Sequence, residues 1–232
     1  MMTSSYTNTV GMEIIDFGVK EYEEVLKLQT SLFTDLIEEK REGKEGKEYI
    51  LIGEHPSVIT IGRRGKDSNI LMSEEGLRQL GIKTFHIGRG GDVTYHCPGQ
   101  LIVYPIFDLE KHNLGVKGYV DLLEETVIRL LKNYNIKGES VEGATGVWLD
   151  KGGDNERKIC AIGIKCSRFC TMHGIALNVN SDLSGFSLIN PCGFQDKGVT
   201  SIKKEISPGR ELGMEEVKKE FLDIFLSLIL PL

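Results

Sequence analysis

Residues 89–105 read RGGDVTYHCPGQLIVYP and join a glycine turn, hydrogen-bonding side chains and an apolar run in one short segment. Gly90 and Gly91 have no Cβ, so the backbone there can lie close to a ligand. Residues 94–96 then offer hydrogen-bonding groups, and residues 101–104 have the pattern of a buried β-strand that would hold the loop still. The segment therefore predicts a ligand-binding loop on a sheet. The alternative is a glycine-rich hairpin with a surface histidine, because glycine turns are common in loops.

A second segment, residues 189–193 (INPCG), places Cys192 between a proline and a glycine. Proline fixes the backbone on one side of the thiol, and glycine frees it on the other. A lone cysteine is ordinarily a small buried hydrophobe, and buried structural cysteines are unreactive. Cys192 lies instead in a predicted turn, where the N–H groups of Cys192 and Gly193 could point at a developing oxyanion. Cys192 is therefore a candidate nucleophile.

Lys158 begins the strand-like run 158–164, after a predicted turn at residues 151–155. A lysine in that position is usually a solvated residue at the edge of a strand. If Lys158 is instead partly buried near Cys192, its ammonium favours the thiolate. Desolvation would also lower the pKa of the lysine toward the range that is useful for proton transfer.

Three blocks of sequence carry a family resemblance: residues 89–105 quoted above, KICAIGIKCSRFCTMHGIALNVN at 158–180, and INPCGFQDKGVTSI at 189–202. A weaker fourth block, EHPSVITIGRRG, covers residues 54–65. The chain resembles the lipoyl(octanoyl) transferases, the LipB family, which move an octanoyl group from acyl carrier protein to a lysine of lipoyl domains. The blocks follow the family's order over roughly residues 49–202, and their combination is far more specific than a single glycine motif.

The resemblance implies roles for individual residues. Cys192 would carry the acyl group as the nucleophile, and Lys158 would be its general acid and base. The residues implied to bind substrate are Arg89, Gly90, Gly91, Asp92, Val93, Thr94, Tyr95, His96, Gln100, Ala161, Ile162, Gly163, His173, Gly174 and Ala176. No cofactor and no metal is implied. The chain departs from the family at Cys97, where glycine is common, which affects the expected conformation of the loop and leaves the chemistry of Cys192 unchanged.

The reaction implied by the resemblance is a two-step acyl transfer. The Cys192 thiolate would attack the octanoyl thioester of acyl carrier protein. A lysine amine would then take the acyl group, on a lipoyl domain of a 2-oxoacid dehydrogenase E2 subunit or on the glycine cleavage H protein. Exchange between thioesters is nearly isoenergetic and amide formation from a thioester is downhill, so no ATP is required. A neutral Lys158 would serve as the base for the incoming ammonium.

Two other functions are alternatives. A lipoate or biotin protein ligase shares a glycine-rich loop, but it activates a free acid with ATP and needs no cysteine nucleophile, so the Pro-Cys-Gly turn at 191–193 argues against it. A non-catalytic acyl-binding or carrier-docking module would keep the pocket without turnover. The presence of both Lys158 and Cys192 disfavours that second alternative.

The composition fits one globular domain, with 232 residues, 40% hydrophobic and 27% charged side chains, and a formal net charge of −6. This acidic balance argues against nucleic acid or an anionic membrane surface as partners, because both require a basic footprint. Acyl carrier protein is itself acidic, and Arg63, Arg64 and Lys66 are candidates to contact it. A solvated charged turn is an equally good interpretation of these three residues.

The five cysteines are an odd number, and residues 1–9 are polar without an apolar signal core. Both features predict free thiols in a reducing compartment, here the cytoplasm. The apolar run 221–232 is shorter than the roughly 20 residues of a membrane span, and its helical spacing predicts a packed terminal helix.

A metal site is disfavoured by the spacing of the remaining candidates. The separations of Cys160, Cys166, Cys170 and His173 match no close cysteine pair. Alternation along one unbroken strand would also place Cys166 and His173 on opposite faces. His173 is therefore better interpreted as a hydrogen-bonding residue of the pocket, or otherwise as a core histidine.

The apolar periodicity outlines a mixed fold. Helical spacing predicts helices at residues 21–42, 73–80, with Ser73 as its cap, 117–134 and 213–230. Strands are predicted at residues 12–16, 49–53, 58–61, 82–87, 101–107, 146–149, 158–164 and 174–178. Strands outnumber helices and arrive in clusters, which favours a mixed sheet flanked by a few helices. The resemblance implies the same α+β class, the biotin/lipoyl protein ligase-like fold, as a single catalytic domain over 1–232 with its core at about 12–230.

Overall fold

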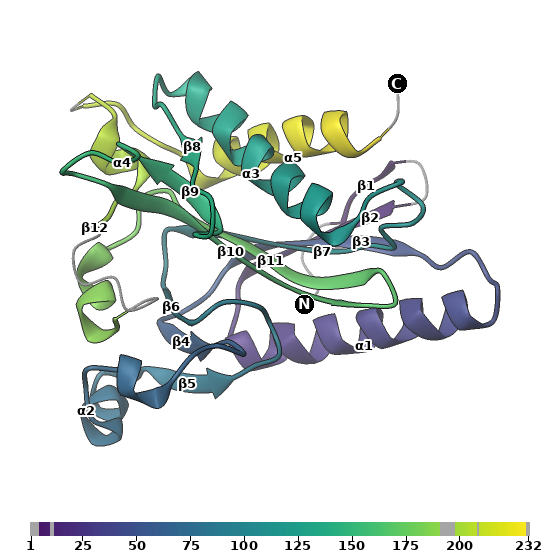
Figure 1. Ribbon diagram of the computed structural model, residues 1–232, viewed down its shortest axis with the longest axis horizontal. Coiled ribbons are helices and arrows are strands. Elements are labelled where there is room, and N and C mark those ends of the chain that lie inside the picture. Colours follow the sequence, from purple (N-terminus) through teal and green to yellow (C-terminus); the bar gives the residue numbers. More distant parts are fainter. Residues whose placement is uncertain (1–4, 10–11, 191–197, 208, 231–232) are drawn as a thin grey trace.

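The large sheet is the framework of the fold in the computed structural model, which describes residues 5–9, 12–190, 198–207 and 209–230 (Figure 1). Its strand order is β1-β2-β3-β7-β11-β10-β9-β8, with β12 paired to β10. The strands are β1 (Ser5–Thr9), β2 (Met12–Val19), β3 (Glu48–Glu54), β7 (Gln100–Ile106), β8 (Glu139–Ser140), β9 (Gly146–Leu149), β10 (Arg157–Ser167), β11 (Cys170–Asn178) and β12 (Gly198–Val199). The pairs β2/β3 and β10/β12 are parallel and the others antiparallel, so the predicted mixed sheet is confirmed.

A second, three-stranded sheet lies beside the first and has the order β5-β4-β6. Its strands are β4 (Val58–Ile61), β5 (Lys83–His86) and β6 (Val93–His96). The helices are α1 (Tyr22–Arg41), α2 (Glu74–Gln79), α3 (Val116–Asn133), α4 (Ile202–Glu205) and α5 (Met214–Ile229), with short 3₁₀ turns η1 (Asp67–Asn69) and η2 (Leu183–Leu188). Figure 1 shows α1 under one face of the large sheet, and α3 and α5 across the other.

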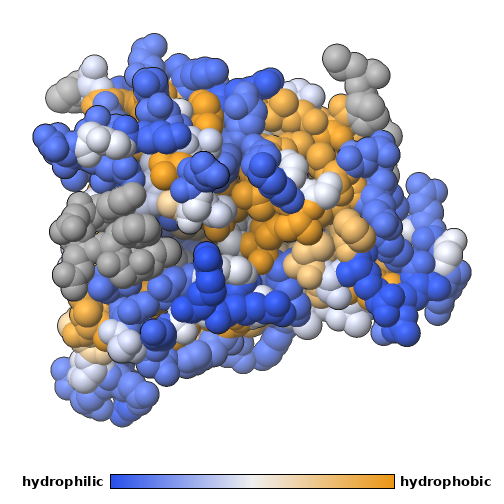
Figure 2. All heavy atoms as spheres, viewed as in Figure 1, coloured by the Kyte–Doolittle hydropathy of each residue, from blue (hydrophilic) through white to orange (hydrophobic). Residues whose placement is uncertain are grey.

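The central strand β7 is buried on both faces because helices cover both sides of the sheet. Leu101 and Val103 join the core that α3 and α5 close, whereas Ile102 and Tyr104 join the core under α1. A third, smaller core fills the lobe of the three-stranded sheet. Figure 2 shows hydrophobic residues at the surface near α5 and the start of α3, with hydrophilic residues around them.

The four predicted helices are present, and each begins and ends within one residue of the predicted ends. Helix α2 also has the expected cap, because the Ser73 hydroxyl accepts a hydrogen bond from Gly76 N at 3.2 Å. The helices form where their apolar residues recur at helical spacing, so each can bury one face. Within the described parts of the chain, no helix combines the length and the apolar composition needed to cross a membrane.

The strands differ more from the prediction. Residues 93–96 form β6 against β4, where the sequence predicts a loop. The strand predicted from residue 174 begins earlier, because β10 and β11 form one long hairpin that turns at Arg168 and Phe169, both with left-handed φ angles of 52° and 64°. His173 lies inside β11 with a φ of 60°, and its N–H donates to Gln29 Oε1 of α1. Because the backbone departs from strand geometry at His173, apolar residues do not alternate regularly along β11 in the sequence.

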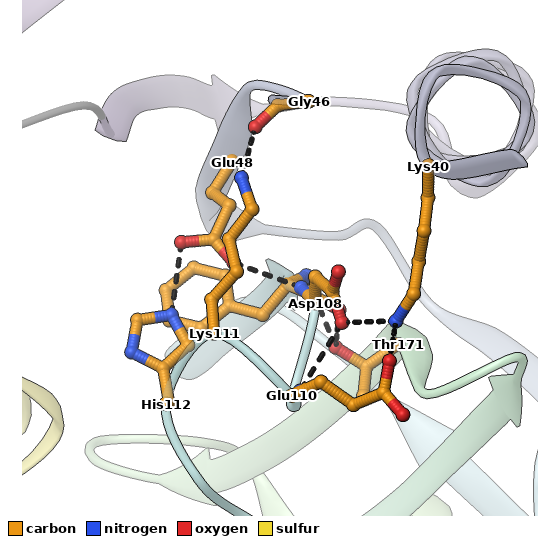
Figure 3. Close-up of polar contacts among 9 residues, drawn as sticks. Lys40, Gly46, Glu48, Asp108, Glu110, Lys111, His112 and Thr171 are labelled. Carbon is orange, nitrogen blue, oxygen red and sulfur yellow. Dashed lines mark hydrogen bonds and ion pairs between the residues drawn. The ribbon is translucent and has the colours of Figure 1, made fainter. Parts of the chain in front are cut away.

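A network of buried and partly exposed charges holds together the loops at the C-terminal end of α1 (Figure 3). Lys40 Nζ lies 2.5 Å from Asp108 Oδ1 and 2.6 Å from Glu110 Oε2. Glu48 Oε1 accepts a hydrogen bond from Asp108 N at 2.8 Å, and Glu48 Oε2 lies 2.9 Å from His112 Nε2. The network ties the end of α1 and the start of β3 to the loop between β7 and α3.

Candidate active site

A cavity of about 690 Å³ is lined by residues of both sheets. One wall comes from the loop before β6 and from His96, a second from residues 161–164 of β10, and a third from residues 173–176 of β11. Arg63 and Arg64, both exposed, also reach its lining. The size lies within the range of about 300–1,000 Å³ that small-molecule sites occupy.

The glycine turn of residues 89–105 lies directly on β10. Gly90 N donates to Ile164 O at 2.8 Å, and Gly91 has a left-handed φ of 89°. A Cβ on Gly163 would lie 2.9 Å from Gly90 O and 3.0 Å from Arg89 Cδ. The absence of side chains therefore lets two backbone segments meet at the cavity wall, as the sequence predicts.

Arg89 holds this loop to the small sheet. Its Nη2 donates to Thr60 O at 2.8 Å and to Thr60 Oγ1 at 2.9 Å, and its Nη1 donates to Gly90 O at 3.0 Å. The side chain is buried and belongs to the cavity lining. These donated bonds fix the loop and supply a buried positive charge beside the cavity.

The histidines of the cavity are neutral near pH 7. Burial, assisted by the neighbouring His55 and Arg89, lowers the pKa of His96 to about 3. Burial, assisted by the Arg89 charge, lowers the pKa of His173 to about 3. Neither imidazole therefore adds a charge to the cavity wall.

A chain of amide contacts sets the orientation of His96. Gln100 Nε2 donates to Asn178 Oδ1 at 2.8 Å, and Asn178 Nδ2 donates to Thr200 O at 2.9 Å. Gln100 Oε1 is then the acceptor for His96 Nδ1, at 2.8 Å. This assignment makes Nδ1 the protonated nitrogen of His96 and leaves Nε2 as an acceptor.

Lys158 is partly buried in the cavity wall on β10. In the sheet it pairs with Trp148 of β9 on one side and with Val199 of β12 on the other. Its Nζ donates to Thr145 O at 3.1 Å and lies 4.4 Å from the centre of the Trp148 ring, a cation–π distance. The sequence did not predict Thr145 or Trp148, which lie ten or more residues before Lys158.

Cys192 lies outside the described residues, but hydrogen bonds fix the described chain on each side of residues 191–197. Asn190 N donates to Asn69 O at 2.7 Å before residues 191–197. After them, Gly198 N donates to Glu156 O and Thr200 N donates to Lys158 O at 2.9 Å. Gly198 and Val199 belong to the cavity lining.

All but one of the predicted substrate-binding residues lie in the lining. These are Arg89, Gly90, Gly91, Asp92, Val93, Thr94, His96, Gln100, Ala161, Ile162, Gly163, His173, Gly174 and Ala176. The prediction that Tyr95 lines the cavity is wrong. Tyr95 alternates with Thr94 and His96 on β6 and faces the core of the small lobe, where its hydroxyl lies 2.8 Å from Ser57 Oγ and its ring meets Phe186.

Further lining residues were not predicted as binding residues. They include Tyr22, Tyr104, Thr145, Trp148, Asn178 and Phe186. The only signal for Trp148 is that it is the single tryptophan of the chain. Tyr22 lies in the first turn of α1, where the sequence shows only an amphipathic helix.

Cys97 is a core residue of the small lobe. It is buried among apolar side chains, its Sγ lies 3.6 Å from Asp182 O, and burial raises the pKa of its thiol to about 11. The left-handed position of this turn is Gly99, with a φ of 82°. A side chain at position 97 is therefore accommodated without backbone strain.

The described cysteines are free thiols, namely Cys97, Cys160, Cys166 and Cys170. Cys166 packs toward the core of α3 and α5, whereas Cys170 packs toward the core of α1, so the two lie on opposite faces of the hairpin. Across the described residues, no group of three or more His, Cys, Asp or Glu side chains is placed to hold a metal ion.

Comparison with known proteins identifies the family. The sequence model of the lipoyl protein ligase A/B catalytic domain matches residues 21–226. An octanoyltransferase from Parabacteroides distasonis is 54% identical over 213 residues, which cover 90% of this chain and 96% of that protein. The chain belongs to the lipoyl(octanoyl) transferase family. It is an acyltransferase by this membership, and the resemblance carried by the sequence blocks is confirmed.

Solved structures of related ligases have the same fold as this chain. A bipartite lipoate protein ligase from Thermoplasma acidophilum has a TM-score of 0.66 at 15% identity, with 93% of this chain and 82% of that chain covered. A biotin protein ligase from Aquifex aeolicus has a TM-score of 0.51 at 16% identity, with 93% and 69% covered. The predicted α+β fold of the biotin/lipoyl ligase type is confirmed.

Proposed function

We propose that this chain transfers an octanoyl, or lipoyl, group from acyl carrier protein to a lysine of lipoyl domains through a thioester on Cys192. One observation carries the proposal: Lys158 lies in the wall of a cavity whose lining also receives the chain immediately after the segment that contains Cys192. The octanoyltransferase relatives support the acyl group and the transfer. The cysteine intermediate and the carrier-protein donor rest on the sequence blocks.

The described chain after the segment that contains Cys192 supports a joint role of Cys192 and Lys158. Thr200, eight residues after Cys192, is bonded to the backbone of Lys158. Gly198 and Val199 line the same cavity as Lys158. We propose that the Cys192 thiol acts in this cavity together with Lys158.

The proton balance of the reaction assigns two tasks to Lys158. In the first step the Cys192 thiolate forms a bond to the acyl carbon, the bond to the pantetheine sulfur breaks, and the Lys158 ammonium protonates the leaving sulfur. In the second step the acceptor lysine attacks the thioester and Cys192 leaves as a thiolate. The acceptor loses two protons between ammonium and amide, of which Lys158 takes one and solvent the other. Lys158 thus returns to its charged form.

The partners follow from this chemistry. The donor is octanoyl-acyl carrier protein, and exposed Arg63 and Arg64 at the cavity, with Lys66 nearby in sequence, would contact its acidic surface. The acceptors are lipoyl domains of 2-oxoacid dehydrogenase E2 subunits and the glycine cleavage H protein. We place the reaction in the cytoplasm and assign it to a single catalytic domain over residues 1–232.

Transfer without ATP tests the function. Purified protein is mixed with octanoyl-acyl carrier protein and a lipoyl domain in the absence of ATP, and the lipoyl domain is weighed by intact mass spectrometry. We expect the gain of one octanoyl group on the domain. A parallel reaction with free octanoate and ATP should give no product. Modification only in the ATP reaction would show a ligase instead, and no product in either would leave an acyl-binding module.

A further inference from the structure

Glu124 is a buried carboxylate that the proposed reaction does not use. It lies on α3 and is 8% exposed, and its carboxylate contacts β9, the strand that pairs with β10 next to Lys158. Glu124 Oε1 accepts a hydrogen bond from Gly146 N at 2.9 Å. Burial raises the pKa of Glu124, whereas the ammonium of Lys158 acts in the opposite direction. The two charges therefore interact.

Glu124 holds the turn before β9 through its hydrogen bond with Gly146 N. The φ of Gly146 is 122°, and a Cβ at this position would clash with Cys160 O, so the backbone is pressed against β10. The residues just before it, 143–145, line the cavity. The carboxylate thus fixes the end of a turn that borders the site, because it satisfies a buried N–H at the first residue of β9.

The same turn supplies the contacts of the lysine. Thr145 O accepts the hydrogen bond of Lys158 Nζ, and the Trp148 ring lies under the ammonium. Trp148 is itself held by the turn, because its Nε1 donates to Ala144 O at 2.7 Å. A shift of the turn would therefore move these two contacts of the ammonium together.

We propose that Glu124 is a positioning residue for Lys158, which holds the turn that cradles the ammonium and places a negative charge behind it. This inference rests on the proposed role of Lys158 as general acid and base. The carboxylate fixes the turn whose Thr145 O holds the ammonium for the first step, in which the ammonium supports the thiolate and protonates the leaving sulfur. The cradle keeps the same nitrogen aimed into the cavity for the second step.

Other titratable groups surround this pair, and the test must separate them from Glu124. Asp121, one turn earlier on α3, raises the pKa of Glu124. Burial raises the pKa of the Cys160 thiol on β10, and the charge of Lys158 lowers it whereas that of Glu124 raises it. Arg157, which precedes Lys158, is paired with Glu205 at 2.6 Å. All of these groups are still present in a Glu124 variant, so each must be the same in the parent and the control.

Two substitutions divide the roles of the carboxylate. Glu124→Gln keeps an oxygen that can accept the hydrogen bond of Gly146 N, but it removes the charge. Glu124→Ala removes both. Glu125→Gln is the matched control, because Glu125 follows Glu124 on the same helix and pairs with Arg129 at the surface.

The experiment measures the charge of Lys158 directly. The ¹³Cε signals of labelled lysines are titrated by NMR, and the Lys158 signal is assigned by its loss in Lys158→Arg. We expect the midpoint of Lys158 to fall by about one pH unit in Glu124→Gln and to stay at the parent value in Glu125→Gln. In the same variant, the pH profile of acyl transfer to the lipoyl domain should move to lower pH.

An unchanged Lys158 midpoint in a folded Glu124→Gln variant would overturn the inference, because Glu124 would then only satisfy Gly146 N. The titration requires no turnover, so its result is separate from that of the proposed function. A shifted midpoint in a protein that transfers no octanoyl group would support the coupling and refute the reaction.

Discussion

Substitution of Asn178 should lower both the free energy of unfolding and the rate of transfer. Its side chain is 4% exposed and joins two elements, since its Oδ1 accepts from Gln100 and its Nδ2 donates to Thr200 O. Asn178→Ala removes both bonds and leaves Thr200 O buried without that partner. Gln100 Nε2 keeps a second acceptor, Tyr95 O at 3.3 Å, so its loss is partial.

The magnitude follows from these two bonds. A buried polar group left without its partner costs about 1–3 kcal/mol, so one full and one partial loss predict a decrease of roughly 2–4 kcal/mol in the free energy of unfolding. This is a large part of the roughly 5–15 kcal/mol that holds a domain folded. The acceptor of His96 also loses its support, so octanoyl transfer should fall by roughly tenfold, the equivalent of about 1.4 kcal/mol.

Urea unfolding followed by circular dichroism gives the first quantity, and a lipoyl-domain transfer assay gives the second. Asn180→Ala is the matched control, because Asn180 is exposed in the same segment, and its free energy of unfolding should change by no more than about 0.5 kcal/mol. A change as small as that in Asn178→Ala would refute the reasoning, because the amide chain would then carry no stability.

Three further predictions concern other parts of the structure. Gly163→Ala should slow transfer and lower stability, because its Cβ would lie 2.9 Å from Gly90 O; an unchanged rate would show that the loop moves freely. The hydrogen bond to Glu48 raises the pKa of His112 above 6.5. The difference in the free energy of unfolding between the parent and His112→Gln should therefore be largest below about pH 6.5 and vanish as pH rises through the raised pKa. Urea midpoints measured against pH test this, and a difference that does not change with pH would contradict it. Cys97→Gly should lower the melting temperature through lost core contacts but keep most transfer, and loss of transfer in a folded variant would give Cys97 a chemical role.

The sequence could predict features that depend on neighbouring residues. The glycine turn at 90–91 lies against another backbone segment, as its lack of side chains suggests. The helices follow their apolar periodicity, and the run 101–104 is buried because it occupies the centre of the large sheet. These predictions succeed because each rests on local spacing that the tertiary structure then uses.

Features that depend on long-range pairing could not be predicted. The sequence pattern predicts a loop at residues 93–96 and so places Tyr95 in the cavity. These residues form a strand instead, and alternation along it turns the Tyr95 ring away. The contacts of Lys158 with Thr145 and Trp148 come from a neighbouring strand and the turn before it. Glu124 lies 34 residues before Lys158, and only packing of α3 on the sheet brings the two together.

The central claim is that Cys192 carries the acyl group and that Lys158 serves both steps. The most direct measurement isolates the acyl-enzyme formed from octanoyl-acyl carrier protein, locates the octanoyl group by peptide mass spectrometry, and follows its single-turnover transfer to a lipoyl domain. We predict an adduct on Cys192 that is absent in Cys192→Ala. Lys158→Arg keeps the charge but cannot act as base, so it should form more adduct than Lys158→Ala and still transfer poorly. An adduct on another cysteine, or transfer at the parent rate in Lys158→Ala, would contradict the account.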